Sequence, residues 1–324
     1  MMGKPSVFVT RRWPAAIEAQ LMERYEVTLN RNDRPLNMFQ VREALRRYDA
    51  VLPTVTDWLG EEALDVPGAR TKILANYGVG YSHICEDAAR RLGVTVTNTP
   101  DVVSECAADL AMTLLLMVAR RAGEGEREVR EGRWTGSGPT HLTGVKVSGK
   151  TLGIVGFGRV GREVAKRAHH GFGMQVLVQD RDPLDPGALA ACGAEQVESL
   201  DELLPRCDFV SLHCPATREN RHLINSSRLD RMKPGAFLIN TASGKLIDDH
   251  ALIQALSYDT IGGAALDVFD AEPRIAPALL ECDNLVMLPN MASATREARE
   301  AMGYRVLENL ADFFDGKPPR DRVI

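Results

Sequence analysis

The sequence predicts an α/β protein made of two successive parallel-sheet units. Short apolar, β-branched runs alternate with helical patterns along almost the whole chain, which is typical of parallel α/β architecture. The apolar run 151–155 leads directly into Gly-Phe-Gly-Arg-Val-Gly at 156–161 and then into a helical pattern, as at the start of a βαβ unit. A chain of 324 residues also exceeds the usual size of a single core, which favours two domains.

The first unit is expected within residues 1–100. Its predicted strands share short β-branched or apolar runs and lie at 6–10, 26–30, 50–53, 73–77 and 94–99. Its predicted helices lie at 14–25, 37–47 and 86–92, and the first of them begins with a proline, as helices often do. This unit ends before the glycine turn, so the turn is assigned to a second unit.

A long helical pattern follows, from about 102 to 121. Its apolar stripe contains Leu110, Leu114, Leu115 and Val118, and the pattern is more apolar all round than a surface helix requires. We therefore expect this helix to be buried, either between domains or at a subunit contact. The polar, glycine-rich segment 124–144 suits an arm or a loop.

The second unit is expected to begin near residue 150. Its predicted strands lie at 151–155, 175–179, 208–213, 236–241, 262–267 and 284–288. The last helical pattern, 295–314, is long and amphipathic, and it would complete the first unit if the chain crosses back near residue 290. The expected domains are therefore 1–100 with 291–324, and 101–290.

Composition points to an ordinary globular protein that is cytoplasmic. Hydrophobic residues make up 44% and charged residues 26%, and a net charge of −5 gives no reason to expect nucleic acid or an anionic membrane as a partner. No window approaches the roughly 18 uninterrupted apolar residues of a membrane span, and the N-terminal residues lack a signal peptide's apolar region. The six cysteines show no paired metal spacing, so we expect reduced thiols and no metal.

The glycine turn has the spacing of a dinucleotide-binding site. Gly156 would permit the tight turn, Gly158 would let a pyrophosphate approach the backbone, and Gly161 would let the helix pack closely on the strand. The helix would offer N–H groups and its positive dipole end to the phosphates. Asp180 follows Gly161 by nineteen residues, where a carboxylate meets an adenosine ribose. The alternative is a helix-opening turn that binds nothing.

Several longer motifs add a family resemblance that covers nearly the whole chain. They lie at 76–84, 96–100, 107–116, 156–161, 212–215, 239–242, 264–269, 271–273, 288–289 and 293–297. With these motifs the chain resembles the D-isomer-specific 2-hydroxyacid dehydrogenases, especially the glyoxylate and hydroxypyruvate reductase branch. The resemblance implies two doubly wound, Rossmann-like domains with a cleft between them: a flavodoxin-like substrate domain, which would be 1–100 with 291–324, and an NAD-binding domain. It also implies a homodimer formed through the cofactor domain.

The resemblance further implies roles for individual residues. Glu272 would be the carboxylate that supports the catalytic acid/base, although it could also be a solvated loop acid. Asp267 would hold the nicotinamide carboxamide, and the N–H groups of Val79 and Gly80 would bind the substrate carboxylate. The residues expected to contact the cofactor through the backbone or as a lining are Arg159, Val160, Cys214, Pro215, Thr241 and Ala242.

Two catalytic positions depart from the family pattern. Ser243 stands where the family has an arginine, and Asn290 stands where it has a histidine. Serine cannot form the paired carboxylate contact of a guanidinium, and asparagine cannot deliver a proton near neutral pH. Lys245 could supply a cation and His83 or His141 a proton, although a solvent-facing lysine and loop histidines are the plainer interpretations.

These observations leave three functions open. The first is an impaired or retargeted NAD-dependent dehydrogenase acting on a small 2-keto or 2-hydroxy acid such as glyoxylate or hydroxypyruvate. The second is an enzyme on the same scaffold with a different substrate, and the third is a catalytically silent NAD-binding sensor or scaffold. Asp180 favours NAD over NADP because a 2′-phosphate would meet a like charge. Arg181 could partly accommodate that phosphate or simply lie on the surface.

Overall fold

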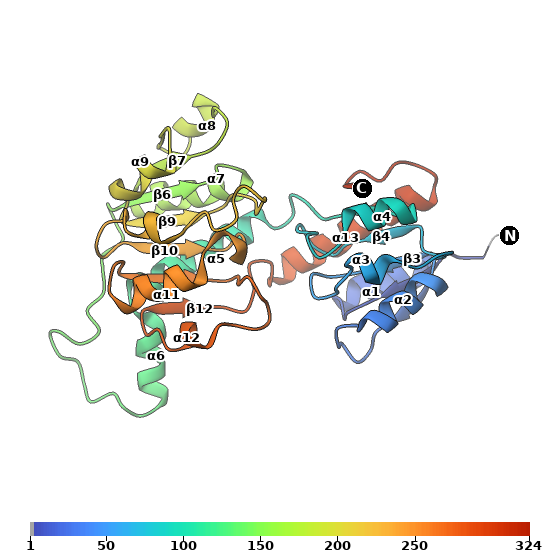
Figure 1. Ribbon diagram of the computed structural model, residues 1–324, viewed down its shortest axis with the longest axis horizontal. Helices are drawn as coiled ribbons and strands as arrows, with labels where there is room; N and C mark the ends of the chain where they lie inside the picture. The colour runs from blue at the N-terminus through green and yellow to red at the C-terminus, as the bar shows by residue number, and fades with distance from the viewer. Residues whose placement is uncertain (1–2) are drawn as a thin grey trace. The chain divides into compact units, whose positions relative to one another are not determined.

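Two parallel sheets, one in each unit of the chain, organise the computed structural model, which describes residues 3–324 (Figure 1). One unit contains the chain up to Val103 and the segment Ala294–Ile324, and the other contains Ser104–Ser293. Every strand pair in both sheets is parallel, with helices connecting the strands. The predicted α/β class with two doubly wound units is confirmed.

The first unit has a five-stranded sheet in the order β2-β1-β3-β4-β5. Its strands are β1 Ser6–Val9, β2 Glu26–Leu29, β3 Ala50–Leu52, β4 Ile73–Ala75 and β5 Thr95–Thr97. Its helices within the first 103 residues are α1 Ala15–Arg24, α2 Met38–Arg47, α3 Glu61–Leu64 and α4 Glu86–Leu92. This is the flavodoxin-like order, in which the direction of strand addition reverses between β1 and β3.

Helix α13, Arg296–Phe314, completes the core of the first unit. Met302, Val306, Leu307 and Leu310 are buried in one cluster with residues of α1, β1 and β4. A Cβ placed on Gly303 would lie 2.6 Å from Cγ1 of Ile17, so the small residue lets α13 approach α1 closely. The chain thus returns to its first sheet after building its second.

The second unit has a seven-stranded sheet in the order β12-β11-β10-β9-β6-β7-β8. Its strands are β6 Thr151–Val155, β7 Gln175–Gln179, β8 Ala194–Gln196, β9 Phe209–Leu212, β10 Phe237–Asn240, β11 Gly263–Leu266 and β12 Leu285–Met287. The strand order reverses at β6, which pairs with β7 on one side and β9 on the other. In parallel α/β sheets a ligand binds at such a reversal, beyond the carboxyl ends of the strands.

The helices of the second unit differ in how deeply they are buried. They are α5 Ser104–Ala119, α6 Ala122–Arg130, α7 Arg159–Lys166, α8 Pro186–Ala190, α9 Leu200–Leu203, α10 Ser226–Leu229, α11 Asp249–Ser257 and α12 Pro277–Leu280. Helix α5 buries Leu114 and Leu115 in the core of its own unit, together with residues of β6 and α7, which accounts for its apolar character.

Helix α6 and the loop after it, residues 122–144, project from the second unit as an arm (Figure 1). No side chain of α6 is buried, and residues 131–141 are exposed. The segment expected to be an arm or a loop, 124–144, is therefore part of this arm, and its first part, up to Arg130, is helical. Two ion pairs, Arg121 with Glu124 and Arg130 with Glu126, join side chains three or four residues apart and support this helix although it buries no side chain.

Candidate active site

The glycine turn follows β6 at the point where the strand order reverses. Gly156 has φ +94°, and a Cβ there would lie 2.7 Å from the backbone nitrogen of Cys214. Only glycine therefore fits at this position, because other residues disfavour this positive φ and their Cβ would clash with Cys214. Its amide donates to the Gln179 carbonyl at 2.8 Å, which ties the turn to the end of β7.

The two later glycines have different surroundings. A Cβ on Gly161 would lie 2.2 Å from the carbonyl oxygen of Gly156, whereas one on Gly158 would meet nothing within 4 Å. Gly158 is the N-cap of α7, and no side chain caps the helix there. Arg159 and Val160 form the first turn of α7, at a helix N-terminus that no side chain caps, and this arrangement fits a pyrophosphate.

Asp180 lies beside this turn, directly after β7. Its Oδ2 accepts a hydrogen bond from the Phe157 amide at 2.7 Å, and its Oδ1 accepts one from the Arg181 amide at 2.8 Å. These bonds hold the carboxylate beside the glycine turn, and its contact with a ribose stays a prediction. The Arg181 guanidinium is 90% exposed and lies 3.9 Å from Asp182, which agrees with the surface interpretation of this arginine.

The end of β9 packs against the turn. Cys214 contacts the position where Gly156 would carry a side chain, and burial raises the pKa of its thiol to about 11. His213 shares a 2.8 Å hydrogen bond with the Ser211 hydroxyl, and burial lowers the pKa of this histidine to about 4. Both groups are therefore uncharged near neutral pH, and Pro215 follows them as an exposed residue.

The end of β10 forms the turn that contains Thr241, Ala242 and Ser243. Buried Asn240 accepts hydrogen bonds from the Ala242 amide at 3.0 Å and the Ser243 amide at 3.3 Å, and its Nδ2 donates to the Ser243 carbonyl at 2.8 Å. The Thr241 hydroxyl is buried without a partner among residues 3–324. A buried hydroxyl with no partner fits a site that a polar ligand group completes.

Close backbone packing brings this turn next to the loop after β11. A Cβ on Gly244 would lie 2.0 Å from the backbone carbon of Phe269. The Phe269 amide in turn donates to Oε1 of Glu272 at 2.9 Å. The Ser243 turn and the Glu272 loop are therefore neighbours, although 29 residues separate them in the sequence.

Glu272 and Asn290 form a direct contact. The Asn290 Nδ2 donates to Oε2 of Glu272 at 2.8 Å. Asn290 has φ +54°, a left-handed conformation that asparagine tolerates, and its amide donates to the Asp267 carbonyl at 2.9 Å. Both side chains belong to exposed residues, and no Lys or Arg within residues 3–324 forms an ion pair with Glu272.

Asp267 holds the segment on which Asn290 lies. Its carboxylate is fully buried and accepts hydrogen bonds from the Met291 amide at 2.8 Å and the Ala292 amide at 3.0 Å. Burial raises the pKa of Asp267, with a smaller contribution from Glu272, and the two amide bonds oppose that rise. No sequence pattern indicated this anchoring role; a contact between Asp267 and the carboxamide stays a prediction.

Lys245, His83 and His141 are the candidates to replace the family's cation and proton donor, and each lies in a different environment. Lys245 is exposed in a short 3₁₀ turn and forms no ion pair with Glu272. Burial lowers the pKa of His83 to about 4, so this histidine is neutral near pH 7 and has no proton to give. His141 lies 3.0 Å from Glu128 on the projecting arm.

In the first unit, Val79 and Gly80 lie in the exposed loop after β4. Asn76 donates to the carbonyls of Gly78 and Gly80 at 3.0 Å, and Asn98 donates to the Val79 carbonyl at 2.9 Å. The amides of Val79 and Gly80 donate to no other described residue, so they are available to an anion.

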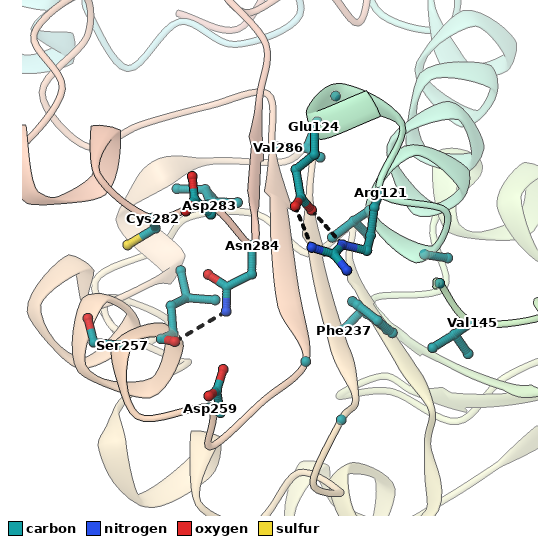
Figure 2. A pocket seen from close by; sticks show the side chains of 18 of the residues that line it. Arg121, Glu124, Val145, Phe237, Ser257, Asp259, Cys282, Asp283, Asn284 and Val286 are labelled. Atoms are coloured by element: carbon teal, nitrogen blue, oxygen red, sulfur yellow. Dashed lines mark hydrogen bonds and ion pairs between the residues drawn. The ribbon is translucent and has the colours of Figure 1, made fainter. Parts of the chain in front are cut away.

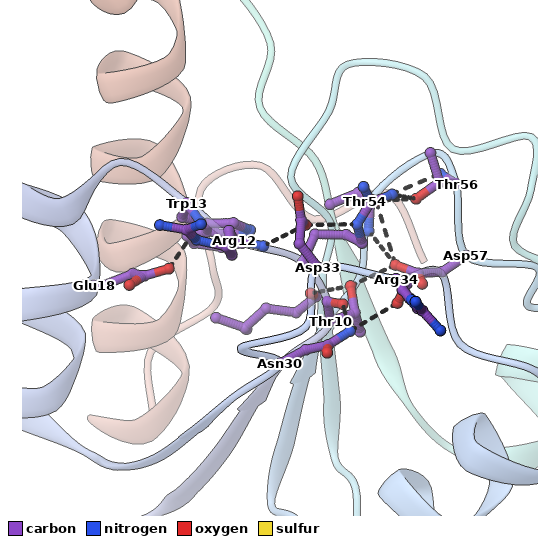
Figure 3. A network of polar contacts seen from close by, with 12 residues as sticks. Thr10, Arg12, Trp13, Glu18, Asn30, Asp33, Arg34, Thr54, Thr56 and Asp57 are labelled. Atoms are coloured by element: carbon purple, nitrogen blue, oxygen red, sulfur yellow. Dashed lines mark hydrogen bonds and ion pairs between the residues drawn. The ribbon is translucent and has the colours of Figure 1, made fainter.

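A polar network supports this end of the first sheet (Figure 3). The buried Asp57 carboxylate accepts hydrogen bonds from the Thr10 hydroxyl and, at 2.9 Å, from the Thr54 amide. Thr54 forms a parallel bridge to Tyr77. The network therefore fixes the loop after β3 beside the loop that contains Val79.

A cavity of about 720 Å³ lies elsewhere in the second unit, at the ends where strands β10 and β12 begin (Figure 2). It is bordered by the first residues of β10 and β12, Phe237 and Leu285, and by the ion pair of Arg121 with Glu124. None of the predicted site residues lines it.

Neither a metal centre nor a membrane span is found in the part of the chain that the structure describes. Within residues 3–324, no three His, Cys, Asp or Glu side chains are grouped as a metal site. No helix in that range has the length and apolar content needed to cross a bilayer.

Comparisons with known proteins cover nearly the whole chain. A family model described as "D-isomer specific 2-hydroxyacid dehydrogenase, NAD binding domain" matches residues 112–292. A protein named glyoxylate reductase from Thermococcus litoralis is 42% identical over 324 residues, which cover 99% of this chain and 97% of that one. A solved structure of a D-isomer specific 2-hydroxyacid dehydrogenase from Polaromonas has a TM-score of 0.92 at 36% identity, covering 99% of this chain and 100% of that one. A protein from Thermus thermophilus has a TM-score of 0.90 at 40% identity, covering 98% and 100%.

Proposed function

This chain belongs to the D-isomer-specific 2-hydroxyacid dehydrogenase family and binds NAD, and we propose that it reduces a small 2-keto acid such as glyoxylate or hydroxypyruvate, slowly for its family. The relative from Thermococcus litoralis, named glyoxylate reductase, supports the substrate class. The observation that supports slow turnover is the pairing of Glu272 with a neutral amide, since no Lys or Arg of residues 3–324 forms an ion pair with that carboxylate.

The bound nicotinamide supplies the hydride in this reaction. The residues of the chain then have three tasks: to hold the substrate carboxylate, to hold the carbonyl oxygen and to protonate it. In this proposal the amides of Val79 and Gly80 hold the carboxylate. Asn290 retains one N–H for the carbonyl oxygen after bonding Glu272, but it cannot release a proton near neutral pH.

The Ser243 hydroxyl makes no hydrogen bond to another described residue, and it has neither the reach nor the charge of a guanidinium. Loss of acid/base catalysis typically lowers a rate by about 10²–10⁴. We therefore expect turnover well below that of a site with arginine and histidine at these two positions. Water would have to deliver the proton.

For the cofactor, we propose NAD in preference to NADP, with Asp180 bonded to the ribose hydroxyls. We also propose the roles assigned above to Asp267, Cys214, Pro215, Thr241 and Ala242 around the nicotinamide. The first unit would bind substrate, the protein would act in the cytoplasm, and the projecting arm, residues 122–144, would contribute to a homodimer formed through the cofactor domain.

The test is NADH oxidation in the presence of glyoxylate and of hydroxypyruvate. Slow but saturable turnover supports the proposal. Rates as high as those of relatives with the family arginine and histidine would overturn the impairment. NADH binding with no turnover of either acid would favour the alternative of an NAD-binding sensor or scaffold.

A further inference from the structure

We propose that the same site reduces protonated imines, formed from a 2-keto acid and ammonia or a primary amine, to amino acids. The inference rests on NADH binding as in the proposed function, but it assigns a different preferred electrophile. It is based on the charge and the hydrogen-bonding groups that Glu272, Asn290 and Ser243 present together.

The charge of the site is negative. Glu272 is the one ionisable group among these three residues, and its carboxylate is bonded to two neutral N–H donors, those of Phe269 and Asn290. The nearby Arg221 guanidinium is engaged 3.1 Å from Asp270, and neither Lys245 nor Arg274 pairs with Glu272 within the described chain. A site with this charge attracts a cationic electrophile more strongly than a neutral carbonyl.

The orientation of the Asn290 amide adds a second acceptor. A carboxylate only accepts hydrogen bonds, so the nitrogen of the amide must face Glu272 and Oδ1 must face away from it. Asp267 fixes the backbone that carries this side chain, because its carbonyl accepts the backbone N–H of Asn290 and its carboxylate accepts those of Met291 and Ala292. Glu272, Oδ1 of Asn290 and the Ser243 hydroxyl are then all able to accept from an N–H group.

A protonated imine matches these groups and needs no acid from the protein. The keto acid first condenses in solution with an amine and a proton, releasing water. The imine carbon then accepts a hydride from the reduced nicotinamide, and the C=N π pair moves to nitrogen to become the amine lone pair. Solvent protonates the amine afterwards. A ketone oxygen, in contrast, must gain a proton as the C=O π pair moves to it, and neither Asn290 nor Ser243 supplies one.

The first experiment compares the two electrophiles in one reaction. Enzyme, NADH and glyoxylate are incubated with and without methylamine, and sarcosine and glycolate are measured by mass spectrometry. When methylamine is present, we expect the ratio of sarcosine to glycolate among the products to be at least about ten, because a charge-assisted hydrogen bond is worth about that factor. Glu272→Gln should lower sarcosine formation by about tenfold or more. The control Glu281→Gln, at a residue that lines the cavity of Figure 2, should not change it.

The second experiment measures binding without turnover. The protein with NADH bound is titrated calorimetrically with sarcosine, whose ammonium group resembles the iminium, and with glycolate. We expect sarcosine to bind about tenfold more tightly, and the preference to disappear in Glu272→Gln while NADH binding is kept. Ser243→Arg, which adds a cation, should reverse the preference.

The outcomes separate the two proposals. Glycolate as the main product in the presence of methylamine, or equal binding of sarcosine and glycolate, overturns the inference and leaves keto acid reduction in place. Sarcosine formation that is unchanged in Glu272→Gln also overturns it. Sarcosine formation with hardly any glycolate supports the inference and removes keto acid reduction as the main activity. Failure to bind NADH overturns both proposals.

Discussion

The amide nitrogen of Asn290 donates a 2.8 Å hydrogen bond to the carboxylate of Glu272. The backbone N–H of Asn290 donates to the Asp267 carbonyl, and its backbone is left-handed, so the conformation of the loop positions the side chain for this contact. The partner of Glu272 is therefore a neutral amide that neither compensates its charge nor transfers a proton. The chemistry proposed for this protein follows from that pairing.

Restoring the two family residues should raise keto acid reduction. Asn290→His supplies a proton donor beside Glu272, and Ser243→Arg supplies a cation for the substrate carboxylate. We expect the double variant to gain about 10²–10⁴ in kcat/KM for glyoxylate, with smaller and non-additive gains in the single variants. Steady-state NADH oxidation measures this. If the folded double variant is no faster than the parent protein, the assignment of these positions is wrong.

Alanine at two glycines of the turn should separate cofactor binding from folding. Gly158→Ala places a methyl in open space, so stability should fall by at most about 1 kcal/mol, the usual cost of alanine at an N-cap, while NADH binds about tenfold or more weakly. Gly161→Ala forces a methyl against the Gly156 carbonyl and should lower the free energy of unfolding by about 1–3 kcal/mol. Urea unfolding and NADH fluorescence titration test both. Unaltered NADH affinity in Gly158→Ala would contradict the pyrophosphate site.

Asp180 should govern the choice between cofactors. Asp180→Asn keeps an oxygen that can accept the Phe157 amide but removes the charge, so NADH should bind about tenfold more weakly while NADPH loses less or gains. Asp182→Asn, two residues further on and exposed, is the matched control and should change neither affinity. The NADH-to-NADPH ratio of dissociation constants is the quantity to follow, and an unchanged ratio in Asp180→Asn would argue against the ribose contact.

Asp267 should matter for the Asn290 segment more than for overall folding. Asp267→Ala leaves the Met291 and Ala292 amides without their acceptor, which should cost about 1–3 kcal/mol of local stability. Hydrogen exchange at residues 290–292 should accelerate, while exchange in β6 stays slow. Equal exchange in variant and parent at these residues would mean that other contacts fix the segment.

Stability of the first unit should depend on acid through Asp49. The Arg70 guanidinium and the Ser6 amide and hydroxyl hold the pKa of Asp49 down, from 3.8 to about 2. Because the pKa of Asp49 is lower in the folded than in the unfolded protein, the ionised carboxylate stabilises the fold at pH values above 3.8. This stabilisation is lost as the pH falls through about 2. Asp49→Asn should therefore be less stable than the parent at neutral pH, and the difference should vanish once the pH lies below about 2. A difference that does not change with pH would contradict this assignment.

The parts of the fold that the sequence predicted are those with strong local patterns. Strands β6 and β9 are buried in the sheet, so they are nearly continuous apolar runs, and Gly156 is required by a local backbone conformation. Strand β8 was missed because Ala-Glu-Gln at an edge needs no apolar run. Helix α6 was missed because it buries no side chain and so shows little core pattern.

The sequence by itself determined the parallel α/β class, the dinucleotide turn at Gly156–Gly158–Gly161 with Asp180 after the next strand, and the departures at Ser243 and Asn290. These are local patterns, each contained in a strand and the turn after it. The tertiary structure decided which distant groups meet: that Glu272 is bonded to Asn290, that Asp267 anchors the segment after it, and that Gly244 packs the Ser243 turn on Phe269. Such contacts depend on which parallel strands become neighbours, because the sheet places their carboxyl ends side by side whatever the distance along the chain.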